Sequence, residues 1–390
     1  MTRITGGYDR TTVGGEEVAA FVPNPLPPTD PPLSVDDDTG RLLQRAEHEL
    51  ARLELASEMV PSVEWFIYGF VRKEAVMSSQ IEGTQATLID LLTFEAQRED
   101  EAPPNADVQE VCNYLDALAY ARNQIRRDNG LPISMRLLNE AHRCLMKGVR
   151  GADKQPGEVR QSQNWIGDTR PGNAAFVPPP PHVLGNVLSD FEKYIHSDDA
   201  LPPLVRAGLL HVQFETIHPY LDGNGRIGRL LITLLLEHWE LLSQPLLYLS
   251  LFFKRYRDDY YRLLNAVRAE GDWEAWSRFF LEGVATIAGE ATSTARDLFA
   301  LVNDDRGRAL AAPKSTVMAV RLFEELPQHP IVTIARATDL LDTTKPTATK
   351  AVSTLVDAGI LTETTGRRRD RTFSYAAYLD LLRAGTELEG

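Results

Sequence analysis

The stretch HPYLDGNGRIGR, residues 218–229, concentrates the groups that bind and transfer phosphate. Its Gly-Asn-Gly core at 223–225 favours a tight turn, because glycine and asparagine tolerate positive φ. Residues 201–217 show an apolar helical pattern, Pro219 interrupts it, and a second helix is predicted to begin near Arg226. Backbone N–H groups at a helix start attract anions, so the turn predicts an anion-binding site.

Four side chains around this turn supply the other parts of a transfer site. His218 has an ordinary pKa that suits proton transfer near neutral pH. Asp222 could hold a Mg²⁺ ion that bridges phosphate oxygens. Arg226 and Arg229 are three residues apart, so both can point at one anion from a single helical face. The set indicates phosphoryl or nucleotidyl transfer; the alternative is a helical corner with a solvated charge cluster.

The stretch resembles the signature of the Fic family, His-Pro-Phe-x-Asp/Glu-Gly-Asn-Gly-Arg-x-x-Arg, and departs from it only at Tyr220. The resemblance implies transfer of AMP from ATP to a Ser, Thr or Tyr hydroxyl of a protein, with Mg²⁺ at Asp222. It implies that His218 is the base and that Asn224 stabilises charge on the α-phosphate. Tyr261 is chosen over Tyr260 as the residue near adenine. The implied ATP-binding residues are Glu82, His218, Gly223, Asn224, Gly225, Arg226, Ile227, Gly228, Arg229 and Tyr261.

The string SSQIEG, residues 78–83, resembles the inhibitory motif of the same family, Ser/Thr-x-x-x-Glu-Gly/Asn. Ser78 and Glu82 are four residues apart on a predicted helix, and Gly83 supplies its end. The resemblance implies that Glu82 pairs with Arg229 and displaces the γ-phosphate of ATP from its productive position. The alternative is an exposed glutamate near a helix end.

Residues 156–184 break the helical period, and AAFV at 174–177 suits a hairpin. The resemblance implies a flap over the site, where the backbone of the target protein pairs as an added strand near Ala174–Val177. An ordinary loop crossing is the alternative. The resemblance also implies a homodimer, and the protein itself is a further candidate target.

The composition of the chain restricts which other classes of protein it can belong to. The formal charge of −14 over 390 residues speaks against a chain that mainly coats nucleic acid. The N-terminus has no apolar signal segment, and the run LLITLLL is shorter than the roughly 20 residues that span a bilayer. Cys112 and Cys144 lack CxxC spacing and fit reduced thiols. We therefore expect a cytoplasmic protein without membrane contact.

We expect a mainly α-helical fold whose helical core carries the small β-hairpin flap. The predicted divisions are a flexible, poorly ordered N-terminus (1–20), an N-terminal segment with the inhibitory helix (21–105), a catalytic core (106–300) and a last domain (312–385). The last domain reads as three helices and a two-stranded wing, which resembles a winged helix-turn-helix domain. The candidate contact residues there are Thr347, Thr349 and Lys350 on the recognition helix and Arg367, Arg368, Arg369 and Arg371 on the wing.

Two other functions stay open at this point. Residues 313–390 hold ten Lys/Arg and ten Asp/Glu, so this neutral segment could contact DNA or could pair with protein instead. A winged-helix regulator whose site only senses ATP is therefore one alternative. The other is a different reaction at the same site: removal of AMP from a modified protein, transfer of another phosphate-containing group, or both addition and removal of AMP by one enzyme.

Overall fold

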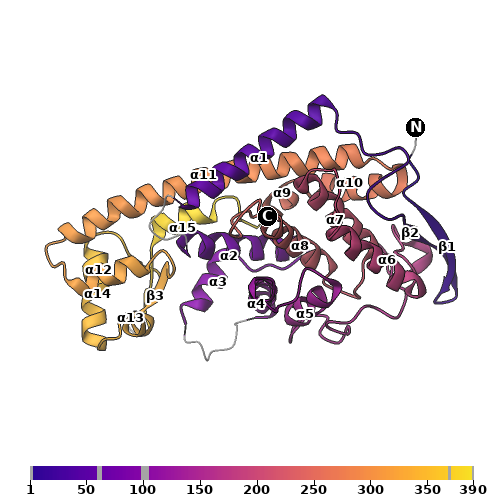
Figure 1. Ribbon diagram of the computed structural model, residues 1–390. Helices are drawn as coiled ribbons and strands as arrows, with labels where there is room; N and C mark the ends of the chain where they lie inside the picture. Colours follow the sequence, from indigo (N-terminus) through magenta and orange to yellow (C-terminus); the bar gives the residue numbers. More distant parts are fainter. Residues whose placement is uncertain (1–2, 59–63, 98–104, 368–369, 389–390) are drawn as a thin grey trace. The chain divides into compact units, whose positions relative to one another are not determined.

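The computed structural model describes residues 3–58, 64–97, 105–367 and 370–388 (Figure 1). Fifteen α-helices dominate this part of the chain, and the strands form two small antiparallel sheets. The predicted mainly α-helical class is therefore confirmed. The chain divides into two compact units. Unit 1 comprises residues 1–51, 113–243 and 252–288, and unit 2 comprises residues 52–112, 244–251 and 289–390.

Unit 1 contains the predicted phosphate-binding stretch. Three helices cross its boundaries: α1 (Asp37–Glu58), α4 (Ala106–Arg126) and α11 (Trp273–Ala311). A fourth helix, the short α9 (Ser250–Arg255), also crosses a boundary of unit 1. Its other elements are β1 (Gly6–Val13), β2 (Glu16–Pro23), α5 (Met135–Leu145), the 3₁₀ turn η1 (Pro171–Asn173), α6 (Pro181–Ile195), α7 (Pro203–Ile217), α8 (Asn224–His238) and α10 (Arg257–Glu270).

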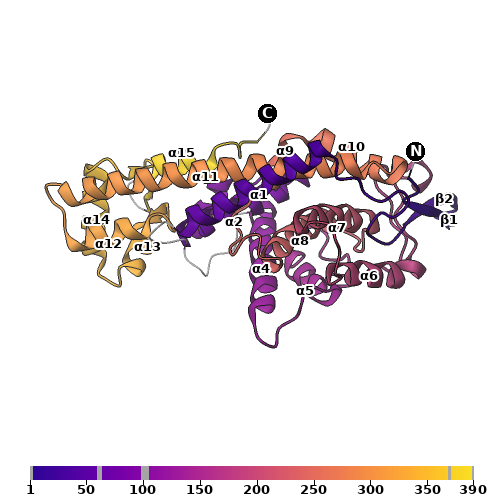
Figure 2. The same ribbon diagram turned by 45° about the horizontal axis from the view of Figure 1, so that its top comes forward.

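Helix α7 is the centre of unit 1. Every residue from Leu204 to Ile217 is buried, polar residues such as Arg206 and His211 included. It packs against α8, α6 and α10, while α5 packs against α8 (Figures 1 and 2). The two helices that flank the phosphate-binding stretch, α7 and α8, are thus held by the core.

The N-terminus differs from its prediction. Residues 1–20 were expected to be poorly ordered, yet β1 and β2 form an antiparallel hairpin whose tight turn, Gly14–Gly15, has φ of 58° and 86°. Val18 and Ala20 of β2 pack against Val177. The prediction is wrong because it weighed only the Gly/Thr-rich composition, whereas the short apolar run of residues 18–22 in β2 suits a strand.

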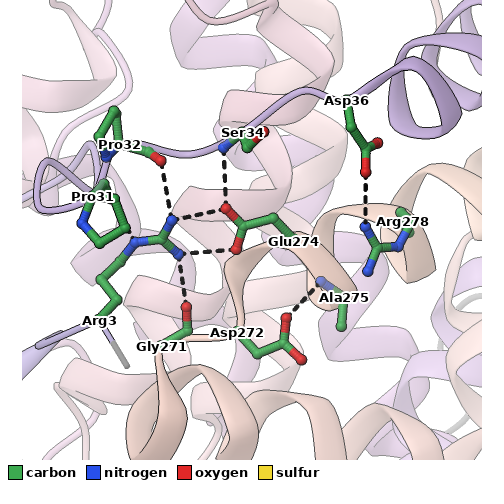
Figure 3. Close-up of polar contacts among 10 residues, drawn as sticks. All are labelled: Arg3, Pro31, Pro32, Ser34, Asp36, Gly271, Asp272, Glu274, Ala275 and Arg278. Carbon is green, nitrogen blue, oxygen red and sulfur yellow. Dashed lines mark hydrogen bonds and ion pairs between the residues drawn. The ribbon is translucent and has the colours of Figure 1, made fainter. Parts of the chain in front are cut away.

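A buried arginine fixes the start of this segment (Figure 3). The guanidinium of Arg3 donates to the carbonyl oxygens of Pro31 (2.6 Å), Pro32 (3.1 Å) and Gly271 (2.7 Å). It also binds both carboxylate oxygens of Glu274, at 2.8 and 3.0 Å. Residues 3–36, here called the N-terminal arm, are therefore anchored at the start of α11.

Unit 2 contains α2 (Glu64–Ile81) and α3 (Leu88–Glu95), the parts of α1, α4, α9 and α11 outside unit 1, and the C-terminal elements. The latter are α12 (Val317–Glu325), β3 (Ile331–Thr333), α13 (Ile334–Leu340), α14 (Lys345–Asp357), β4 (Thr362–Glu363), β5 (Thr372–Ser374) and α15 (Ala376–Arg383). The strands β3, β5 and β4 form an antiparallel sheet in that order. Arg368 and Arg369 lie outside the described residues.

Helix α11 continues through residues 301–311, where the prediction placed a gap between the catalytic core and the last domain. None of the described helices combines the length and the hydropathy that a bilayer span requires.

Candidate active site

The predicted tight turn is present between α7 and α8. Helix α7 ends at Ile217, and His218 follows it in the left-handed conformation, with φ 51° and ψ 62°. The His218 N–H still donates to the Phe214 carbonyl at 2.9 Å. Gly223, with φ 77°, precedes α8, which begins at Asn224 and so starts two residues earlier than expected. His218 therefore opens the short loop that joins α7 to the buried helix α8.

The start of α8 is suited to an anion. The first N–H groups of any α-helix have no acceptor inside the helix, and here those groups belong to residues 224–226. The first intrahelical bond runs from the Ile227 N–H to the Gly223 carbonyl, at 3.1 Å. The helix dipole adds a partial positive charge at the same end. The predicted anion site thus has its expected local structure.

Asp222 lies beside this helix start. One carboxylate oxygen accepts the Gly223 N–H at 2.6 Å and lies 3.7 Å from the Arg226 guanidinium. The side chain is 36% exposed. No cluster of three potential metal ligands occurs among the described residues. One accessible carboxylate beside an anion site still fits Mg²⁺, which takes its remaining ligands from phosphates and water.

The two arginines of the motif are both buried, with 1% of Arg226 and 2% of Arg229 exposed. They come from successive turns of α8. Arg226 also contacts the sulfur of Met146 on the α5 side, at 3.8 Å. Gly228 gives α8 close contact with α7, since a Cβ there would meet the Glu215 carboxylate at 2.4 Å.

The side chain of Asn224 holds the loop before α8. Its amide oxygen accepts the Tyr220 N–H, and its amide nitrogen donates to the Tyr220 carbonyl, both at 2.8 Å. Only 2% of Asn224 is exposed. These two bonds show that the side chain fixes the loop, and its role in stabilising charge on the α-phosphate stays a prediction.

His142 on α5 was not predicted as a site residue, although it holds the same loop. Its ring stacks on Tyr220 with centroids 3.9 Å apart and planes 5° apart. Its Nδ1 accepts the Gly157 N–H at 2.8 Å, so Nε2 carries the proton and donates to the Asp222 carbonyl at 3.0 Å. Burial lowers the pKa of His142 to about 4, so the ring is neutral at neutral pH.

Arg160 is a second residue that sequence reasoning missed. Its guanidinium donates to the carbonyl oxygens of His218 (2.9 Å), Pro179 (2.5 Å) and Ile217 (3.4 Å). Its own N–H donates to the Pro219 carbonyl at 2.9 Å. Burial lowers the pKa of Arg160 to about 10, which leaves it charged at neutral pH. A cation at the C-terminal end of α7 stabilises the carbonyl groups there and fixes the turn at His218.

The two adjacent tyrosines of α10 differ in burial. Tyr260 is buried, and its hydroxyl donates to His211 Nε2 at 2.9 Å, while His211 Nδ1 donates to the Gly228 carbonyl at 3.0 Å. Burial lowers the pKa of His211 to about 3. Tyr261 is 43% exposed. Tyr260 thus belongs to the core beneath α8, and contact of Tyr261 with adenine stays a prediction.

The segment predicted as a flap forms a minimal hairpin. Ile166 and Phe176 exchange both backbone hydrogen bonds, at 2.9 and 3.2 Å, in an isolated bridge. The Val177 carbonyl accepts the Phe21 N–H of β2 at 2.9 Å. The N-terminal hairpin therefore lies along the outer edge of residues 174–177, which the sequence did not predict.

The inhibitory residues lie in unit 2. Ser78 is buried in the last turn of α2, which ends at Ile81. Glu82 is partly exposed just beyond the helix, and Gly83 follows with φ 95°. The predicted helix end is confirmed, and the pairing of Glu82 with Arg229 stays a prediction.

Residues 132–236 match the Fic/DOC family model, and residues 40–123 match the Fic/DOC family N-terminal model. A Drosophila grimshawi protein named Protein adenylyltransferase Fic is 31% identical over 154 residues, which cover 39% of this chain and 29% of that protein. A protein of the same name from Aedes aegypti is 28% identical over 252 residues, which cover 64% of this chain and 43% of that protein. The matched part is thus less than half the length of these relatives.

The fold is shared with a solved structure of a Fic family protein from Desulfovibrio desulfuricans. The TM-score is 0.56 at 20% identity, and the alignment covers 88% of this chain and 97% of that one. The family models match the segments that carry the turn at His218, the anion-binding start of α8 and helix α2. The chain thus contains the two Fic/DOC family domains, at residues 40–123 and 132–236.

Proposed function

We propose that the protein is a protein adenylyltransferase that transfers AMP from ATP to a Ser, Thr or Tyr hydroxyl of a protein. The observation that carries the proposal is the left-handed turn at His218, at the end of α7 and in the short loop that leads to the anion-binding start of α8 at Asn224. The relatives named Protein adenylyltransferase Fic support the same reaction.

In the proposed step the target hydroxyl oxygen attacks the α-phosphorus of ATP. A new oxygen–phosphorus bond forms while the bond from the α-phosphorus to the bridging oxygen of pyrophosphate breaks. His218 takes the hydroxyl proton, and pyrophosphate leaves with the electron pair of the broken bond. The backbone N–H groups at the start of α8 stabilise charge on the α-phosphate, and Arg226 and Arg229 hold the leaving pyrophosphate.

Asp222 would hold Mg²⁺ in this proposal. Mg²⁺ held there would neutralise phosphate charge. On the protein side, the carboxylate is oriented by the Gly223 N–H, and the loop that carries it is fixed by His142.

Glu82 is the proposed brake. Its motif, with Ser78 four residues before it and Gly83 after it, resembles the inhibitory motif of the family, and it stands at the end of a helix as that motif requires. In the proposal, Glu82 pairs with Arg229 and excludes the productive position of the γ-phosphate.

The target is proposed to add a strand to the flap near Ala174–Val177. Phe176 uses its backbone groups on Ile166, so in an antiparallel pair the groups of Ala175 and Val177 point the other way. The Val177 carbonyl on that side already accepts the Phe21 N–H of β2, so the proposed pairing uses the backbone of Ala175. A backbone partner on that side gives affinity with little demand on sequence. The protein itself is a candidate target, and a homodimer is part of the same proposal.

We also propose that residues 312–385 form a winged-helix domain that contacts DNA. Three helices, α12 to α14, precede the β4–β5 pair, and Thr347, Thr349 and Lys350 lie on α14. A gel shift of a duplex from the protein's own promoter, which weakens steeply with salt and is lost in an Arg367→Glu/Arg371→Glu variant, would support it. Binding that neither salt nor the two substitutions change would contradict it.

The proposed reaction is tested by comparing wild type with His218→Ala. ATP affinity, measured by isothermal titration, should change little, because the anion site is formed by α8. Transfer of AMP, measured as an adduct by intact mass, should fall by roughly a hundredfold or more, because that is the usual effect of losing a general base. Retained transfer in His218→Ala would contradict the assignment, and bound ATP without an adduct in any variant would favour removal of AMP instead.

A further inference from the structure

A pocket of about 260 Å³ lies beside the flap, where the N-terminal hairpin, residues 171–177 and α10 meet. Three of its lining residues are aromatic. The ring centroids of Tyr8 and Phe21 are 5.4 Å apart, and those of Phe21 and Phe176 are 6.4 Å apart. Every residue of the pocket belongs to unit 1. The pocket therefore borders the flap residues where the target strand is proposed to pair.

Arg268 of α10 lines this pocket and has an incomplete set of partners. Its Nε donates to the Leu264 carbonyl at 3.0 Å, and its guanidinium lies 4.0 Å from the centre of the Phe176 ring. The two terminal nitrogens have no hydrogen bond or ion pair among the described residues. Burial lowers the pKa of Arg268 to about 10, which leaves it cationic at neutral pH. A partly buried cation without a carboxylate ion-pair partner favours an anionic ligand.

Two carboxylates lie near this cation, and neither forms an ion pair with it. The Glu215 carboxylate on α7 raises the pKa of Arg268 through its charge, which partly offsets the effect of burial. Glu17 on β2 lines the pocket and is exposed. The other ionic contact near the flap is satisfied, since Glu16 binds Arg170 at 2.9 Å and the Gly172 N–H at 2.9 Å.

We propose that this pocket is a target-recognition site for an acidic side chain, Asp or Glu, in the segment that pairs with the flap. The inference rests on the proposed function and adds a substrate class to it. The planar fork of Arg268 can hold a carboxylate through two parallel N–H···O bonds. The rings of Tyr8, Phe21 and Phe176 can cover the methylene groups of that side chain.

The pocket is formed before any target arrives. The Thr5 hydroxyl donates to the Arg268 carbonyl at 2.9 Å, and Gln213 of α7 donates to the Asn24 carbonyl at 2.9 Å. These bonds fix both ends of the hairpin, and Arg3 anchors the arm that carries it (Figure 3). A preformed wall lowers the ordering cost of binding.

The test measures peptide binding to the full-length protein without ATP. Fluorescent peptide pools with a central serine and random flanks carry Glu at one fixed position from three before to three after the serine, and matched pools carry Gln there. At one position the Glu pool should bind about tenfold tighter by anisotropy, as expected for one charge-assisted pair. The variant Arg268→Gln should remove this preference, and Arg268→Lys should keep part of it.

The matched control is Arg262→Gln, because Arg262 is exposed on the same helix and pairs with Asp259 away from the pocket. It should retain the preference for Glu. Glu17→Gln should strengthen binding of the Glu pool alone, which keeps the proposal testable if Arg268→Gln does not fold. Absence of any Glu preference in wild type, or a preference that survives Arg268→Gln, would overturn the inference. If wild type prefers the Glu pool but transfers no AMP, the result would instead contradict the proposed reaction.

Discussion

One imidazole ring connects three parts of the candidate site. His142 stacks on Tyr220, accepts the Gly157 N–H and donates to the Asp222 carbonyl. A ring with a single tautomer and two fixed hydrogen bonds positions the backbone that carries the proposed metal ligand. The rate of transfer should therefore depend on His142 although it touches no reacting atom.

The variant His142→Phe keeps the stacked ring and loses both hydrogen bonds. We expect it to lower AMP transfer about tenfold or more, because a small displacement of an active-site loop is costly. We also expect a loss of about 1–3 kcal/mol in unfolding free energy, since the buried Gly157 N–H loses its acceptor. His142→Gln, which retains a donor and an acceptor, should restore part of the activity. Equal activity in His142→Phe and wild type would refute this role.

Stability at low pH should depend on His211. Burial lowers its pKa in the folded state to about 3, below the ordinary value of 6.5. The unfolded chain therefore binds a proton that the folded chain does not, and the stabilisation present above pH 6.5 is lost as pH falls towards 3. Between pH 7 and pH 5, the protonation of His211 in the unfolded chain should lower the free energy of unfolding by about 2 kcal/mol.

The control is His211→Phe, which keeps an aromatic ring beside Phe253, whose plane lies 10° from that of His211. It should be less stable than wild type at pH 7 but should lose about 2 kcal/mol less between pH 7 and pH 5 in urea titrations. An identical loss in both proteins would show that His211 does not titrate in this way.

At the residue scale the sequence predicted the local parts of the site and missed the distant ones. The turn and the helix start follow from Gly223, Asn224 and Pro219, whose backbone preferences act within a few residues. His142 and Arg160 lie far from the motif in sequence. Nothing in the residue type or the periodicity of α5 shows that His142 faces a loop, because that depends on tertiary packing.

At the scale of elements, the N-terminal arm is the main departure from the prediction. The helices α2, α7 and α8 could be predicted because an apolar period and their end residues act together. The hairpin of β1 and β2 could not be recognised from Gly/Thr-rich composition, since its stability comes from contacts with Val177 and from the anchor at Arg3. The arm is also held at its other end by Asp36, 3.8 Å from Arg278.

The anchor predicts a local effect of Arg3→Ala. Loss of the five contacts of this guanidinium should release the arm and raise amide hydrogen exchange of residues 6–23, because local opening becomes less costly. Exchange in α7 and α8 should stay as in wild type. Arg10→Ala is the matched control, since Arg10 is an exposed residue of β1. Unchanged exchange in Arg3→Ala would show that the hairpin does not need this anchor.

At the scale of the whole molecule, the proposed brake and the proposed site belong to different units. Glu82 lies in unit 2, whereas His218 and Arg229 lie in unit 1. The mainly helical architecture followed from the sequence because periodic apolar residues extend over most of the chain. The proposed coupling of Glu82 to Arg229 joins residues of both units, so it has to be measured on the full-length protein.

The most direct measurement compares two labels in wild type, Glu82→Gly and the double variant Glu82→Gly/His218→Ala. Each protein is incubated with ATP labelled on either the α- or the γ-phosphate, and protein-bound label is counted. We expect the α label to accumulate on protein, faster in Glu82→Gly than in wild type, and to vanish in the double variant, while the γ label never appears. Incorporation of the γ label, or α label that persists without His218, would contradict AMP transfer by this site.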